Sequence, residues 1–284
     1  MTGSPIRTIA DLDRVGRALG EHFKTDLVVV IGSQSVLVGW PDAPKIMRTS
    51  GEIDAYPANY LEWEAAPDNE GFIASEEINA LFGVDSNFED AHGFYIDGCD
   101  GTTARLPPGW EKRAVYRDVS SYGKAVTIVA PCTDDMALSK LVRLVEKDKG
   151  WLSSHHEQRP LDKNMLLTRL RESNVRPEIY DNAANFLSGL PDRIPQRIPL
   201  ISEIPLFPPD THCAFVSPRD NSIVVRKWDS KVGLYHRIDN PLGPAIVSGG
   251  TSRFVLDGRA LSEEEWHARV RPGSTQGADP KPKP

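Results

Sequence analysis

Two acidic residues, Glu52 and Asp54, flank Ile53 in the segment RTSGEIDAYP at residues 48–57. Residues two apart on a β-strand project to the same face, so a strand here would present both carboxylates together and turn Ile53 to the core. Two such carboxylates can hold Mg²⁺ and align a hydroxyl for in-line attack on a nucleotide α-phosphate. Such a pair taken alone is more often a solvated strand edge, so the neighbouring sequence must separate the two interpretations.

A second candidate site precedes the acids. The run LVVVI at 27–31 predicts a buried strand, and Gly32 and Ser33 follow it before SQSVLVGW, which favours a helix. A turn between a strand and a helix exposes backbone N–H groups at the helix N-terminus, where a triphosphate can bind. Gly32 alone is also typical of a strand-ending turn. The order of turn and then acids favours a phosphate and metal arrangement.

The elements that would position these residues alternate in type, which predicts an α/β (α+β) domain. Apolar spacing predicts a helix over 133–152, capped by Thr133 or Asp134. Gly83 is expected to end a helix that Ser75 caps. The other predicted helices are 8–23, 161–174 and 178–190, and the other predicted strands lie within 52–56, 93–98 and 124–131.

The composition excludes several classes of protein. The chain has 284 residues, 39% hydrophobic and 26% charged, as expected for one large or two modest globular domains. Its net charge of −7 predicts no generally basic surface for nucleic acid. Three scattered cysteines argue against a disulfide framework, and no apolar run is long enough to cross a membrane, so we expect a cytoplasmic protein.

The composition changes after residue 190. Six prolines between 191 and 210 predict an extended linker, and short strand-like runs at 211–271 predict a small β-rich module. Residues 272–284 are expected to be disordered. We therefore expect a catalytic-type domain at 1–190, the linker, the module and a tail.

The motifs together resemble a known superfamily. VIGSQSVLV followed by RTSGEIDAYP resembles the G-S and (D/E)-x-D signature of DNA polymerase β-type nucleotidyltransferases. APCTDDMALSKLVRLVEKDKGWL and GFYIDGCDGTTARLPPGWEKR are similar to segments of a bacterial branch related to AbiEii-like toxin nucleotidyltransferases. The resemblance covers roughly residues 10–155, and it implies the nucleotidyltransferase fold, a mixed sheet with flanking helices.

The resemblance also implies roles for individual residues. Gly32 and Ser33 would hold the phosphates of a nucleoside triphosphate, and Glu52 and Asp54 would bind Mg²⁺ or Mn²⁺. Lys140 would contact the triphosphate, and the later acid on the same predicted helix would be Asp148. A third metal-binding carboxylate would be Asp97. The activity implied is transfer of a nucleoside monophosphate to a hydroxyl of RNA or protein, with a neutralising antitoxin or another protein as partner.

Alternatives remain open for the later residues. Lys140 also suits the polar face of an amphipathic helix, and Asp148 suits a structural pair with Arg143 or Lys149. The first acid is Glu where Asp is commoner, and Arg143 is expected to face away from the site. These departures motivate a second hypothesis. In it the protein is an inactive nucleotidyltransferase-like protein that binds a ligand or a partner but does not catalyse the transfer.

Two further motifs allow more than one interpretation. The pair His155–His156 in SSHHEQ could suggest zinc, but no cysteine or acid stands at ligand spacing, so a solvated helix end is favoured. LYHRIDNPLGPAIV and SRFVLDGRALSEEEW, at about 233–266, resemble an HRxDGPA-type repeat of phage and bacterial proteins. That resemblance predicts a structural turn, and it favours a third hypothesis in which this module binds a partner.

Overall fold

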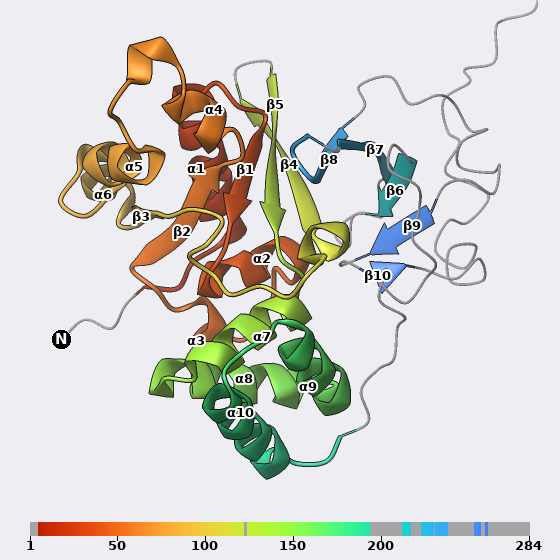
Figure 1. Cartoon of the computed structure of the whole chain (residues 1–284). Coiled ribbons are helices and arrows are strands. Elements are labelled where there is room, and N and C mark those ends of the chain that lie inside the picture. Colours follow the sequence, from red (N-terminus) through yellow and green to blue (C-terminus); the bar gives the residue numbers. More distant parts are fainter. Residues whose placement is uncertain are drawn as a thin grey trace, which may run out of the picture.

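A computed structural model describes residues 5–121, 124–193, 212–216, 223–229, 231–237, 253–256 and 259–260. It contains a five-stranded sheet in the order β3-β2-β1-β5-β4 and a second five-stranded sheet in the order β10-β9-β6-β7-β8. Figure 1 shows the first sheet beside helices on one side and the second sheet on the other. The predicted mixed α/β fold with a small β-rich C-terminal part is confirmed.

The first sheet is mixed in direction. β1 pairs parallel with β5 and antiparallel with β2, β2 pairs parallel with β3, and β4 pairs antiparallel with β5. Valine and isoleucine dominate its central strands because branched side chains pack well on a pleated, buried surface. The strands are β1 (Leu27–Val30), β2 (Glu52–Pro57), β3 (Tyr95–Gly98), β4 (Val115–Ser121) and β5 (Lys124–Ala130).

The helices cover one face of this sheet and extend below it. Helix α1 packs Leu12, Val15 and Leu19 into the main core. Thr8 is its N-terminal cap, and Asp11 accepts the Thr8 N–H at 2.8 Å in a capping box. The longer helices are α1 (Ile9–His22), α5 (Ala74–Phe82), α6 (Asn87–His92), α7 (Thr133–Arg143), α8 (Glu146–Gln158), α9 (Lys163–Glu172) and α10 (Pro177–Gly189). The short ones are η1 (Ser33–Ser35), α2 (Val36–Gly39), α3 (Lys45–Arg48), α4 (Tyr60–Glu64), η2 (Pro67–Asn69) and η3 (Trp110–Arg113).

The prediction of one helix over 133–152 was wrong. The helix is interrupted at Leu144, which has a left-handed φ of 48°, so α7 ends at Arg143 and α8 starts at Glu146. Leu144 N–H still bonds to the Lys140 carbonyl, which closes the last turn of α7. Apolar periodicity continues across the break and therefore could not reveal it.

Three smaller expectations also differ from the structure. Cys132 and Ile73, and not Thr133, Asp134 or Ser75, are the N-terminal cap residues of their helices. His155 and His156 lie on α8 but are almost fully buried, so the expected solvated helix end is wrong. The imidazole of His156 contacts the Pro191 carbonyl at 2.8 Å and the Leu161 N–H at 3.1 Å. Buried imidazoles need such partners, and His155 Nδ1 likewise contacts the Arg159 carbonyl at 3.0 Å.

The C-terminal sheet contacts the open face of the first sheet. Arg226, itself buried, donates to Asp118 Oδ1 at 2.6 Å and lies over the Tyr116 ring at 4.8 Å. Tyr235 N–H donates to the Tyr116 hydroxyl at 3.2 Å. The strands of the C-terminal sheet are β6 (His212–Val216), β7 (Ile223–Asp229), β8 (Leu234–Arg237), β9 (Arg253–Leu256) and β10 (Arg259–Ala260).

Several predictions concern other segments. Most of the expected linker, much of the expected β-rich module and the tail at 272–284 lie outside the described residues. The division into separate domains stays a prediction. Among the residues that the structure describes, none of the helices has the length and apolar character needed to cross a membrane.

Candidate active site

The turn after β1 requires glycine at position 32. Gly32 has a φ of 70° and a ψ of −160°, a backbone region that is open essentially to glycine alone. A Cβ at this position would overlap the carboxylate oxygen Oδ2 of Asp54 on the neighbouring strand. The glycine therefore lets the backbone before Ser33 approach an acid of β2 directly, as the predicted phosphate turn and acid pair require.

We expect Gly32→Ala to destabilise the protein more than a matched glycine substitution. Gly93 has almost the same φ of 71° but a ψ of 23°, the ordinary left-handed region, and a Cβ there would meet nothing within 4 Å. Gly93→Ala should cost about 1–2 kcal/mol for the left-handed backbone alone. Gly32→Ala should lose a further 1–3 kcal/mol or so, because its backbone region is closed to other residues and Asp54 must move. Urea unfolding of both variants measures the difference, and equal losses would contradict the close approach.

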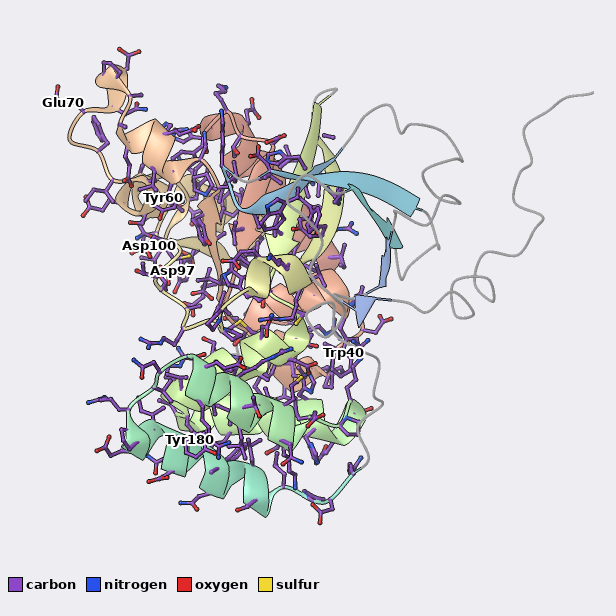
Figure 2. All side chains as sticks on the ribbon, turned by 45° about the vertical axis from the view of Figure 1, so that its right-hand side comes forward. Trp40, Tyr60, Glu70, Asp97, Asp100 and Tyr180 are labelled. Atoms are coloured by element: carbon purple, nitrogen blue, oxygen red, sulfur yellow. The ribbon has the colours of Figure 1, made fainter. Side chains whose placement is uncertain are left out.

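Three acids share one face of the sheet, called here the acid face: Glu52, Asp54 and Asp97. Glu52 and Asp54 alternate with Ile53, which is fully buried in the core as predicted. The parallel register of β2 and β3 places Asp54 opposite Asp97, so these two side chains project to the same side. Figure 2 shows Asp97 on the flank of the sheet above α9 and α10.

The acid face has the electrostatics of a cation site. The pKa of Asp54 is raised to about 6, first by burial and then by the negative charges of Glu52 and Asp97. Burial, followed by the charge of Glu52, also raises the pKa of Asp97. Carboxylates that raise each other's pKa are stabilised by a cation that neutralises them.

A tyrosine that the sequence analysis did not single out contacts the first acid. The Tyr95 hydroxyl donates to Glu52 Oε2 at 2.6 Å, and this bond is the first cause of a raised Tyr95 pKa. Glu52 lies opposite Tyr95 in the β2–β3 register. The pairing of two strands 43 residues apart is a tertiary property, so only the register could have identified Tyr95.

Lys140 reaches the turn after β1. Its Nζ donates to Ser33 Oγ at 2.9 Å and to Asp148 Oδ1 at 3.3 Å. The lysine side chain is 3% exposed, and burial lowers its pKa while Asp148 opposes that shift. A buried ammonium tied to this turn places a positive charge where phosphates of a nucleotide would lie.

Arg143 was expected to face away from the site, and that expectation was wrong. Its Nε and Nη2 bond to the two carboxylate oxygens of Asp148, each at 2.7 Å. The break at Leu144 makes this contact possible, because it turns the first turn of α8 back onto the last turn of α7. The charges of Asp54 and Glu52 contribute to the raised Arg143 pKa, after the hydrogen bond to Asp148.

Asp148 is the fully buried anchor of these two cations. Burial raises its pKa, but the bonds from Arg143 and the charge of Lys140 outweigh that effect, so the pKa is lowered overall. The structural pairing with Arg143 that the sequence left open is thus present, while Lys149 pairs with Glu146 instead. Because its oxygens accept hydrogen bonds from Lys140 and Arg143, Asp148 is suited to hold these two cationic side chains and not a metal ion.

The acid face suits magnesium by the chemistry of its donors. Mg²⁺ prefers oxygen ligands, and in nucleotide enzymes it is bound by one or two carboxylates together with substrate phosphates. Within the part of the chain that the structure describes, no group of three or more His, Cys, Asp or Glu residues is close enough to hold a metal unaided. Asp54 with Glu52 or Asp97 would therefore share the ion with the nucleotide.

The comparisons agree with this geometry. A family model described as "Nucleotidyltransferase of unknown function (DUF6036)" matches residues 7–186. Neither the curated proteins nor the solved structures gave a match. The match extends from α1 to α10 and so includes the turn after β1, the acid face and Lys140. The chain therefore belongs to this nucleotidyltransferase family of unknown function.

Proposed function

We propose that the protein transfers a nucleoside monophosphate from a nucleoside triphosphate to a hydroxyl, with Mg²⁺ or Mn²⁺ bound at the acid face. The observation that supports this most is the convergence of three distant segments. Gly32 lies directly against Asp54, and Lys140 bonds to Ser33 beside it. Acids, a phosphate turn and a buried cation are the parts that phosphoryl-group transfer requires.

In the proposed reaction the acceptor oxygen attacks the α-phosphorus, and the bond between the α-phosphorus and the bridging oxygen breaks. Pyrophosphate leaves with that electron pair, and Lys140 and Arg143 offset its charge. The hydroxyl proton passes to a carboxylate of the acid face that does not bind the ion. A bound Mg²⁺ would supply charge neutralisation at Asp54 with Glu52 or Asp97.

The acceptor and biological role extend this proposal. The resemblance to AbiEii-related toxins implies RNA or protein as acceptor and an antitoxin-like partner. The net charge of −7 gives no support to a long RNA, because nucleic-acid binding is largely driven by contacts of Lys and Arg with phosphates.

A second candidate function is nucleotide binding without transfer. The observation in its favour is the 2.6 Å bond from Tyr95 to Glu52, which engages one oxygen of the first acid. In this case the protein would bind a nucleoside triphosphate through Ser33 and Lys140 and release it unchanged. The expected result is nucleotide binding with no labelled product.

Label transfer tests the first proposal against the second. The protein is incubated with Mg²⁺, each α-labelled nucleoside triphosphate, and total RNA, cell lysate or a small-molecule extract. We expect label in an acceptor with the native protein and none with Asp54→Asn. Transfer that persists in the Asp54 variant would contradict the assignment of the acid face. Nucleotide binding without any transfer would favour the second function.

We expect Lys140→Met to weaken nucleotide binding. A charge-assisted hydrogen bond contributes about 1.5–3 kcal/mol, which corresponds to roughly a 10–100-fold rise in the KM for the nucleoside triphosphate. Lys147→Met is the matched control, because Lys147 is an exposed lysine on α8 that carries the same charge. Initial rates at varied nucleotide concentration separate the two variants. A KM that rises equally in both would contradict a direct role for Lys140.

A further inference from the structure

A cavity of about 530 Å³ lies on the same face of the sheet as the acids. Its floor includes Leu27 and Val29 of β1 and Tyr56 of β2. Tyr56 follows Asp54 by two residues on one strand, so both side chains project to the same side. The antiparallel register places Val29 opposite Tyr56, which confirms that the cavity floor and the acid face are one continuous surface.

The cavity and the acids are close enough to serve one ligand. Two residues along a strand span about 7 Å. Between the two lies Cys99, a buried thiol whose raised pKa reflects burial first and then the charges of acids including Asp54. Figure 2 shows Tyr60 of the cavity, Asp100 and Asp97 along the same flank.

Aromatic rings form the side of the cavity that faces the acids. Tyr56 and Tyr60 meet edge to face, with ring centroids 5.8 Å apart, and Trp110 lines the same space. A Cβ on Gly101 would lie 3.6 Å from the Tyr56 hydroxyl and 3.9 Å from the Tyr60 hydroxyl, so both hydroxyls converge there. Burial is the main cause that raises the pKa of Tyr56, which keeps its hydroxyl protonated and able to donate.

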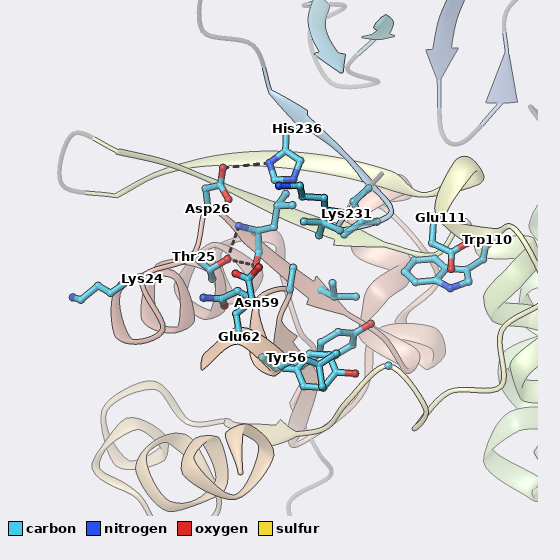
Figure 3. A pocket seen from close by; sticks show the side chains of 18 residues that line it. Lys24, Thr25, Asp26, Tyr56, Asn59, Glu62, Trp110, Glu111, Lys231 and His236 are labelled. Carbon is cyan, nitrogen blue, oxygen red and sulfur yellow. Dashed lines mark hydrogen bonds and ion pairs between the residues drawn. The ribbon is translucent and has the colours of Figure 1, made fainter. Parts of the chain in front are cut away.

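The C-terminal sheet supplies the opposite wall. The turn between β7 and β8 and the start of β8 contribute Lys231, Val232, Leu234 and His236. An ion pair between His236 Nδ1 and Asp26 Oδ2 at 3.5 Å joins the two walls, and Figure 3 marks it with a dashed line. The Arg226–Asp118 bond at 2.6 Å fixes this sheet against β4. The module thus completes a binding site that the first domain alone would leave open.

The charges around the cavity disfavour a phosphate chain. The cations of the lining do not outnumber its acids: Lys24, Lys231 and His236 stand against Asp26, Glu62 and Glu111. A triphosphate or a nucleic-acid strand needs an excess of cations, which this cavity lacks. Flat rings bind well against tyrosine and tryptophan, and cavities of roughly 300–1,000 Å³ take small molecules.

We propose that this cavity binds the acceptor of the transfer reaction, an uncharged small molecule of about nucleoside size that has a flat ring and a hydroxyl. The C-terminal module forms one wall of that site and so selects the acceptor. The role of the cavity as an acceptor site rests on the proposed function, whereas its ability to bind a flat ring is independent of that function.

Binding to the whole chain tests the cavity directly. Adenosine, uridine and N-acetyl-L-tyrosinamide serve as ring probes, and myo-inositol is the polyol without an aromatic ring. Each is titrated with the nucleotide site filled by α,β-methylene-ATP and Mg²⁺. We expect at least one ring probe to bind and myo-inositol not to bind. Failure of all three ring probes would overturn the proposal.

Matched substitutions show whether the probe binds in this cavity. Val232→Trp should fill the cavity from its exposed rim and raise the probe Kd at least 10-fold, and Tyr60→Phe should weaken binding by removing one hydroxyl. Val84→Trp, at another exposed valine that does not line the cavity, should change nothing. Unchanged binding in Val232→Trp, or tighter binding of a single-stranded RNA hexamer that Val232→Trp does not affect, would overturn the proposal.

The same titrations keep the two proposals apart. α,β-Methylene-ATP alone reports the nucleotide site, and its failure to bind counts against the proposed function. Ring probes measured without that analogue report the cavity. With α-labelled ATP, transfer to a bound hydroxyl probe should show a KM for the probe that rises in Val232→Trp while the KM for ATP does not. If Val232→Trp changed only the KM for ATP, the cavity would not be the acceptor site.

Discussion

Asp54→Asn is expected to lower nucleoside monophosphate transfer by at least about 10³-fold in kcat, because the acid face then loses a charge that would hold the metal or accept the proton. The same substitution should make the protein more stable at neutral pH. Asp54 is packed beside Glu52 and Asp97, so its charge is a cost to the folded state in the absence of a cation. Loss of activity combined with a gain in stability is typical of a site built for function.

The gain in stability of Asp54→Asn over the native protein should depend on pH between about 4 and 6. The Asp54 pKa is raised from 3.8 to about 6 in the folded protein, so the folded state binds the proton more tightly than the unfolded state. Stability of the native protein should therefore fall as pH rises from about 4 to 6, by up to about 3 kcal/mol from this group. Asparagine has no such titration.

Urea unfolding in EDTA at pH 4, 5, 6 and 7.5 measures this effect. The stability difference between Asp54→Asn and the native protein should grow between pH 4 and 6 and stay constant above. Added Mg²⁺ should stabilise the native protein more than the variant. A difference that does not change with pH would show that Asp54 is not held in the charged, crowded surroundings described above.

Asp135→Ala should cause the largest loss of stability, about 3–5 kcal/mol. Asp135 is fully buried at the start of α7 and accepts bonds from Arg113 at 2.7 Å and Arg169 at 2.8 Å. Its removal leaves two buried guanidinium groups without their shared anion. This cluster joins η3 and α9 to the helix that carries Lys140, so nucleotide binding should weaken as well.

Glu146→Ala is the matched control, since Glu146 pairs with Lys149 on the surface and its side chain is 90% exposed. An exposed pair contributes at most about 1 kcal/mol. Guanidinium unfolding of both variants gives the comparison, and Asp135→Asn, which keeps the shape, should lose less than Asp135→Ala. Similar small losses for Asp135→Ala and Glu146→Ala would contradict an essential buried cluster.

The strands and the acid pair followed from local pattern. Branched residues at 27–31 predicted β1, and the alternation of Glu52, Ile53 and Asp54 correctly placed Ile53 in the core. Such patterns are local, because the period of a strand fixes which side chains share a face. Helix α1 and its Thr8 cap followed from the 3.6-residue period in the same way.

The sequence by itself determined a mixed α/β fold with a glycine turn, two acids on one strand face, and a lysine later in the chain. Only the tertiary structure decided how these meet. The break at Leu144 brings Arg143 onto Asp148, strand register sets Tyr95 against Glu52, and docking of β8 closes the cavity. Register, helix breaks and docking depend on contacts between residues far apart in the chain, and such contacts leave no periodic signal in the sequence.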